Sequence, residues 1–160
     1  MKIFIAIFYS LILFSSIASA DQANILQPEG DIDLVVLDQL QEGRWELVMF
    51  WATYCPICKR DFVKLAKFFE DNPDISITIV GVVADGTEQK EKALTQIEKR
   101  KLNYSHILTD FEQSKKFFQK QAESNLIGVP SYLLYNTENE MVGFNHHAID
   151  VDALEIYVYE

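Results

Sequence analysis

Cysteine is scarce in this sequence. Among 160 residues there are only two, Cys55 and Cys58, and they lie three positions apart. A structural disulfide between distant parts of the chain is therefore excluded. A chain of about this length buries an adequate core without cross-links, so it does not need the staples of a small disulfide-rich scaffold. The two thiols are thus set apart for chemistry at one place in the chain.

Basic residues are also few. The 14 lysines and arginines are outnumbered by 24 aspartates and glutamates, which gives a formal net charge of −10. Nucleic-acid binding depends on basic patches that neutralise phosphates, so this balance disfavours such a function. The acidity favours solubility and indicates no particular activity. The sequence has no internal repeat, low-complexity tract or linker, and its length indicates one domain.

Long apolar runs are confined to the N-terminus. Residues 3–17 are largely apolar, Lys2 precedes them, and Ala18-Ser19-Ala20 follows as a small-x-small triplet. These features are typical of a secretory signal peptide. We therefore expect residues 1–20 to be a signal peptide that is removed from the mature protein.

Cleavage before Asp21 would leave residues 21–160 as one exported domain, which we expect in the periplasm. An oxidising compartment of that kind lets disulfides persist. The alternative is an uncleaved membrane anchor, because residues 3–20 just reach the lower limit for a spanning helix. A lipoprotein is disfavoured, since no cysteine follows the apolar run.

The hydrophobic pattern alternates strands with helices. Residues 45–51 are almost entirely apolar, as in a strand covered on both faces, and residues 75–83 are rich in the β-branched residues that strands favour. The predicted strands are 45–51, 75–83, 104–108, 131–135 and 141–144, with a short edge strand at 32–40, and the predicted helices are 55–71, 87–101, 111–123 and 151–159. This order predicts an α/β fold: a central mixed sheet flanked by helices, with parallel crossovers first and an antiparallel hairpin last.

The helix predicted at residues 55–71 follows the first of these strands. Pro56 suits its first turn, where the missing N–H would have no partner in any case. Apolar residues at helical spacing predict the side that faces the core. The predicted core face is Phe62, Leu65, Ala66 and Phe69, and the predicted solvent face is Lys59, Arg60, Lys64 and Lys67.

Both cysteines fall at the start of this helix. Disulfide exchange needs an attacking thiolate and a second thiol that releases the mixed disulfide. Cys55 meets the first need, because free N–H groups and the positive end of the helix dipole stabilise an anion there, and Lys59 and Arg60 add positive charge. Cys58, one turn on, suits the resolving role. The alternatives are a structural bridge, which would constrain little loop entropy, and half of a zinc site, which would need two further ligands.

Residues 51–58, Trp-Ala-Thr-Tyr-Cys-Pro-Ile-Cys, resemble the active-site segment of the thioredoxin superfamily. Val129-Pro130 resembles its second marker, a Val-Pro dipeptide whose cis proline faces the cysteines. Residues 79–85 and 104–110 resemble the extra strand-helix insert of the TlpA-like branch. The likeness covers most of residues 32–160.

This resemblance implies a thioredoxin-like fold and the activity of the TlpA-like branch. That branch holds exported thiol-disulfide reductants, including proteins that act in cytochrome c maturation. The only redox group that the resemblance implies is the Cys55–Cys58 disulfide itself, with no cofactor and no metal.

The residues around the thiols carry further expectations. Pro130 offers the cysteines no backbone N–H and no metal ligand, and the exposed backbone of Val129 would pair with an incoming peptide strand. Trp51 and Tyr54 are expected to flank the thiols as an apolar rim that binds substrate, although Trp51 would serve equally as core.

Asp61 is the departure from thioredoxin that matters most for mechanism. Thioredoxin-like proteins often keep a buried carboxylate on the strand before the cysteines, where this sequence has Met49. Asp61 instead lies three residues after Cys58, one helical turn away on its side, and the TlpA-like branch often places an acid there. A carboxylate at this point would accept the proton of Cys58 during resolution. The alternative is a solvated helix aspartate.

The leading hypothesis is an exported thiol-disulfide oxidoreductase that reduces disulfides of other exported proteins and is re-reduced by a membrane electron donor. Cys-Pro-x-Cys pairs occur in oxidants as well as reductants, so a disulfide oxidase or isomerase remains open. A copper or zinc handling module is an alternative, with His146 or His147 assisting the thiolates, although strand neighbours point to opposite faces. A thiol peroxidase is disfavoured, because Ala52 stands three residues before Cys55 where that chemistry would want a threonine.

Overall fold

The computed structural model describes residues 25–27 and 31–159 of the chain. The predicted signal peptide at residues 1–20 and its cleavage site lie outside the described residues and stay predictions. None of the helices in the described part of the chain combines the length and the apolar character that a membrane span requires.

Six strands in the described residues form one mixed sheet in the order β1-β4-β3-β2-β5-β6. The strands are β1 (Ile25–Leu26), β2 (Trp45–Trp51), β3 (Ile77–Val83), β4 (Ser105–Leu108), β5 (Ser131–Tyr135) and β6 (Met141–Asn145). Central β2 runs parallel to β3 and antiparallel to β5, and β5 and β6 form the C-terminal hairpin. The parallel crossovers and the final hairpin are therefore confirmed.

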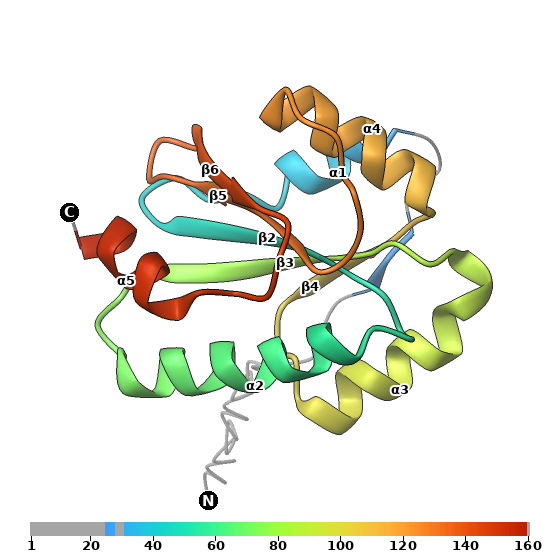
Figure 1. The fold of residues 1–160 in the computed structure, drawn as a ribbon, viewed down its shortest axis with the longest axis horizontal. Helices are drawn as coiled ribbons and strands as arrows, with labels where there is room; N and C mark the ends of the chain where they lie inside the picture. The colour runs from blue at the N-terminus through green and yellow to red at the C-terminus, as the bar shows by residue number, and fades with distance from the viewer. Residues whose placement is uncertain (1–24, 28–30, 160) are drawn as a thin grey trace, which may run out of the picture.

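Helices cover both faces of the sheet (Figure 1). They are α1 (Ile32–Leu37), α2 (Pro56–Asp71), α3 (Lys90–Arg100), α4 (Phe111–Ala122) and α5 (Val151–Tyr159), and a short 3-10 helix, Thr87–Gln89, precedes α3. Helices α2 and α3 lie against one face and α1 and α4 against the other (Figure 1). The predicted α/β fold with helices on both faces is confirmed.

Alternation along β2 divides the core into two layers, because successive strand residues point to opposite faces. Leu47, Met49 and Trp51 pack with both cysteines in the layer under α2. Val48 and Phe50 pack in the layer under α1 and α4. The last residues of β2 and the first turn of α2 therefore share one buried layer, and packing in this layer fixes the position of the cysteines.

The edge strand predicted at residues 32–40 is wrong, because this segment is helical. Asp31 caps α1 by accepting a hydrogen bond from the amide of Asp33 at 3.0 Å. Ile32 and Val36 lie one turn apart on the same side and are buried in the layer under α4. Two buried residues at this spacing secure a helix that is only six residues long, whereas its β-branched residues favour a strand by propensity alone.

The core face of α2 is also shifted from the prediction. Phe62 and Leu65 are buried as expected, but Ala66 is exposed, and Phe68 is buried more deeply than Phe69. The buried stripe begins at Cys58, whose position is fixed by the disulfide, and continues at helical spacing from there. The prediction used only the apolar residues after Cys58, and it therefore assigned Ala66 and Phe69 to the core in place of Phe68.

Candidate active site

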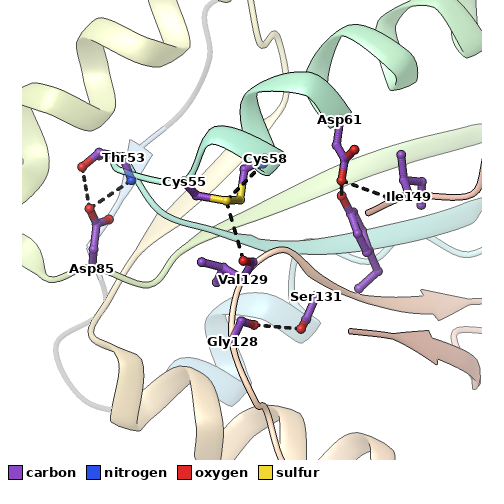
Figure 2. The surroundings of a disulfide bond; sticks show 10 residues. Thr53, Cys55, Cys58, Asp61, Asp85, Gly128, Val129, Ser131 and Ile149 are labelled. Atoms are coloured by element: carbon purple, nitrogen blue, oxygen red, sulfur yellow. Dashed lines mark hydrogen bonds between the residues drawn. A yellow bond between two sulfur atoms is a disulfide. The ribbon is translucent and has the colours of Figure 1, made fainter. Parts of the chain in front are cut away.

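Cys55 and Cys58 form a disulfide at the start of α2. Cys55 is the N-cap residue of the helix, with extended backbone, and Pro56 is its first helical residue. Cys55 is 4 % exposed and Cys58 is fully buried. Cys55 is thus the less deeply buried of the two and lies at the open end of the helix, ahead of Cys58 (Figure 2).

The helix terminus favours negative charge on Cys55. Its Sγ accepts a hydrogen bond from the backbone amide of Cys58 at 3.0 Å, one of the N–H groups that have no partner within the helix. The positive end of the α2 dipole adds to this, because an anion near a helix N-terminus is stabilised. A thiolate formed at Cys55 is therefore stabilised by a group already in place.

The segment at residues 128–131 faces the disulfide from the other side of the site. The peptide bond between Val129 and Pro130 is cis, as the resemblance implies. The carbonyl oxygen of Val129 lies 3.7 Å from Cys55 Sγ, while the side chain of Ser131 donates to the carbonyl of Gly128 at 2.8 Å. Figure 2 shows this turn directly opposite the sulfurs, so two segments more than 70 residues apart in sequence build the site.

Asp61 is buried on α2, one turn beyond Cys58. Its Oδ2 accepts hydrogen bonds from the hydroxyl of Tyr132 at 2.7 Å and from the amide of Ile149 at 3.0 Å. Burial, followed by the hydrogen bond to Asp61, raises the pKa of the Tyr132 hydroxyl, which therefore stays a donor. Oδ1 is buried and has no hydrogen-bond partner among the described residues. The solvated aspartate reading of Asp61 is wrong.

Asp85 is a part of the site that the sequence did not indicate. Its Oδ2 accepts from both the amide of Thr53, at 3.0 Å, and the hydroxyl of Thr53, at 2.5 Å. Asp85 follows the end of β3, and β3 lies beside β2 with the same direction, so its carboxylate meets the turn that leads from β2 into Cys55 (Figure 2). The only available signal was an acid placed directly after a buried parallel strand.

Trp51 and Tyr54 have opposite environments. Trp51 is 1 % exposed and packs edge-on against Phe62, with ring centroids 5.2 Å apart, in the same core layer as the disulfide. Tyr54 is 70 % exposed. The structure thus favours the core reading of Trp51, and of the two residues only Tyr54 presents a surface to a substrate.

The family model described as the AhpC/TSA family matches residues 20–142. This match covers more than half of the chain, including both cysteines and Val129-Pro130. The chain belongs to the AhpC/TSA family. The resemblance to the thioredoxin superfamily is thereby confirmed.

Among curated proteins, this AhpC/TSA chain is similar to sporulation thiol-disulfide oxidoreductase A of Bacillus subtilis. The two are 27 % identical over 101 residues, which make up 62 % of this chain and 58 % of the relative. The matched part of the chain thus spans less than two thirds of the length of that relative.

Solved structures show the same fold. The thioredoxin domain of a thiol-disulfide oxidoreductase from Bacteroides vulgatus is 24 % identical, with a TM-score of 0.59, 73 % of this chain and 81 % of that chain covered. A thiol:disulfide interchange protein of the thioredoxin family from Chlorobium tepidum is 17 % identical, with a TM-score of 0.62, 78 % of this chain and 81 % of that chain covered. At these identities the AhpC/TSA chain shares a thioredoxin-like fold with both.

The histidines considered as assisting metal ligands are His146 and His147. His146 Nδ1 is 3.2 Å from the hydroxyl of Ser131, and His147 is exposed. Within the described residues of this AhpC/TSA protein, no three side chains of histidine, cysteine, aspartate or glutamate converge as metal ligands would.

Proposed function

We propose that this chain is an exported thiol-disulfide oxidoreductase that reduces disulfides of other exported proteins. The observation that carries the proposal is the different position of the two cysteines at the α2 N-terminus: Cys55 caps the helix and is 4 % exposed, whereas Cys58 lies within the first turn and is 0 % exposed. Disulfide exchange needs one cysteine that attacks the substrate and a second that then resolves the mixed disulfide, and these positions suit Cys55 and Cys58 to the two roles. The proteins to which the chain is similar are themselves named thiol-disulfide oxidoreductases.

In the first step the thiolate of reduced Cys55 attacks one sulfur of the substrate disulfide. A bond forms between Cys55 Sγ and that sulfur, the substrate S–S bond breaks, and the other substrate sulfur leaves as a thiolate that takes up a proton. The amide of Cys58, 3.0 Å from Cys55 Sγ, stabilises the attacking thiolate.

In the second step Cys58 attacks Cys55 Sγ. The Cys55–Cys58 disulfide forms, the mixed disulfide breaks, and the second substrate sulfur leaves as a thiol. The substrate has gained two electrons and two protons, and the pair has lost two electrons. A membrane electron donor then restores the dithiol, since the compartment would otherwise keep the pair oxidised.

Asp61 is the proton acceptor in this second step. Cys58 must lose its proton before it attacks, and Asp61 is the buried carboxylate one turn along the same helix. Tyr132 and Ile149 hold its Oδ2 and leave Oδ1 without a partner among the described residues. The unpartnered oxygen is the one available to receive a proton.

The surface around Cys55 suits a protein substrate. Tyr54 and Ile57, beside the cysteines, and Ile127, beside the facing turn, are exposed apolar side chains. They flank, in sequence, the two segments that build the site, and exposed apolar groups beside a site suit contact with a protein partner. The backbone of Val129 adds a strand edge that an extended peptide can pair with.

Trapping with single cysteine variants tests the proposal. Cys58→Ser should accumulate mixed disulfides with exported proteins, because the resolving thiol is missing, whereas Cys55→Ser should not. Non-reducing electrophoresis and mass spectrometry of the trapped species identify the substrates. Equal trapping by both variants would contradict the assigned roles. Stoichiometric copper binding by the reduced protein, without disulfide turnover, would favour the metal-handling alternative instead.

A further inference from the structure

His146 and Ser131 face each other across the C-terminal hairpin. In the β5–β6 register Tyr132 pairs with Asn145, so Ser131 and His146 occupy the next opposed positions. The Nδ1 atom of His146 lies 3.2 Å from the Ser131 hydroxyl oxygen. This contact joins the end of β6 to the residue that directly follows Pro130.

The hydroxyl of Ser131 has a single proton to give, and it gives it to Gly128. Ser131 is fully buried and its Oγ lies 2.8 Å from the Gly128 carbonyl oxygen, which can only accept. The same oxygen is then left to accept, which favours the His146 tautomer with its proton on Nδ1. In that tautomer His146 donates to Ser131 and Ser131 donates to Gly128.

The His146 ring is held in place by aromatic neighbours. Its centroid is 4.9 Å from that of Phe118 on α4 and 5.4 Å from that of Phe144 on β6. Partial burial, and then the nearby His147, lower the pKa of His146. A ring fixed by two aromatic contacts presents its Nδ1–H in one direction and so fixes the hydroxyl that receives it.

We propose that His146 is a positioning residue for the substrate-facing turn, acting through Ser131 on the carbonyl of Gly128. The next residue is Val129, whose carbonyl oxygen lies 3.7 Å from Cys55 Sγ (Figure 2). Holding the Gly128 carbonyl therefore holds the backbone edge with which a peptide substrate pairs. This inference rests on the proposed function, because it assigns to His146 the orientation of that edge.

Two substitutions at His146 separate hydrogen bonding from packing. His146→Phe keeps an aromatic ring between Phe118 and Phe144 but has no donor. His146→Asn loses the ring but places an amide N–H near the position of Nδ1. His147→Phe is the matched control, because His147 is exposed and its side chain lies outside the chain of donors.

Steady-state reduction of a disulfide-bonded peptide reads out the effect. Loss of one net hydrogen bond corresponds to about a fivefold change in an equilibrium, so His146→Phe should raise KM by about fivefold with kcat little changed. His146→Asn should restore most of the wild-type KM, and Ser131→Ala combined with His146→Phe should be no worse than the more impaired single variant. An unchanged KM in His146→Phe, or additive losses in the double variant, would overturn the proposal.

The imidazole tautomer provides a second readout that does not depend on activity. Nitrogen-15 chemical shifts of His146 in the wild-type protein should show a protonated Nδ1 and an unprotonated Nε2. The opposite tautomer would overturn the chain of donors even if the enzyme is active. An inactive wild-type protein with the expected tautomer would instead sink the proposed function and leave the hydrogen-bond chain standing.

Discussion

One carboxylate oxygen of Asp85 accepts hydrogen bonds from both the amide and the hydroxyl of Thr53. Thr53 lies two residues before Cys55, and Asp85 lies two residues beyond the end of the neighbouring strand β3. The turn that brings the chain from β2 into α2 is therefore held from the side by a residue 32 positions away. This link makes the geometry of the disulfide depend on β3.

Asp85→Ala should destabilise the protein and impair turnover. The amide of Thr53, a buried residue, would lose its acceptor, a change that costs about 1–3 kcal/mol. Asp85→Asn keeps one acceptor oxygen and should recover part of the loss, and Thr53→Val, which retains the amide hydrogen bond, should cost less than Asp85→Ala. Denaturant unfolding and kcat/KM together provide the test. Equal stability of Asp85→Ala and wild type would show that the hydrogen bonds contribute nothing.

Gly81→Ala should be strongly destabilising. A Cβ at Gly81 would clash with Nδ1 of the buried His106 ring and lie 2.9 Å from its Cε1. Overpacking of this kind costs about 1–3 kcal/mol or more. Gly143→Ala is the matched control, because nothing lies within 4 Å of a Cβ built there. Thermal unfolding of the two variants should differ clearly; similar melting temperatures would mean that His106 moves aside at little cost.

Glu46→Gln should remove a pH dependence from stability. Burial raises the pKa of Glu46 from 4.5 to about 7, so between these values the folded state holds a proton that the unfolded state has released. The folded state therefore loses stability as pH rises from about 4.5 to about 7. The unfolding free energy of the variant should therefore rise relative to that of wild type across this pH window, and the difference should stay constant above it. Unfolding free energies measured at pH 4, 5.5, 7 and 8 would reveal this, and parallel curves for the two proteins would contradict it.

Asp61→Asn should slow resolution of the mixed disulfide. The amide keeps the shape of the side chain but does not take a proton from Cys58, and loss of a general base lowers a rate by roughly a hundredfold. Asp71→Asn on the same helix serves as control, since Asp71 is exposed and pairs with Lys67. Decay of a preformed mixed disulfide after rapid mixing measures the step directly. An unchanged decay rate in Asp61→Asn would leave the carboxylate a purely structural role.

Short local sequence patterns were sufficient to predict most of the fold and the centre of the site. Residues 45–51, the cysteine spacing and Val129-Pro130 are short segments whose meaning depends on adjacent residues, and all three appear in the structure as expected. The segment at residues 32–40 was mispredicted for the opposite reason. Its helix depends on burial of Ile32 and Val36 against distant elements, which overrides local propensity.

Contacts between the ends of different strands could not be predicted. Asp85 meets Thr53 only because β3 and β2 lie in parallel register, and His146 meets Ser131 only because β5 and β6 pair as they do. Neither acid nor histidine stands near its partner in the sequence. Once strand order and register are known, both contacts can be deduced. Continuing the strand pairing beyond the ends of the strands places the two residues of each contact side by side.

The complete burial of Cys58 beneath Cys55 restricts the order of events during turnover. In the proposed reaction a substrate and an electron donor both react at Cys55 Sγ, so the two cannot be bound productively at once. Under the proposed function the two half-reactions alternate, the protein leaves one partner before it meets the other, and kinetics of the ping-pong type follow. An excess of either partner in the wrong redox state would then compete for that sulfur and slow the other half-reaction.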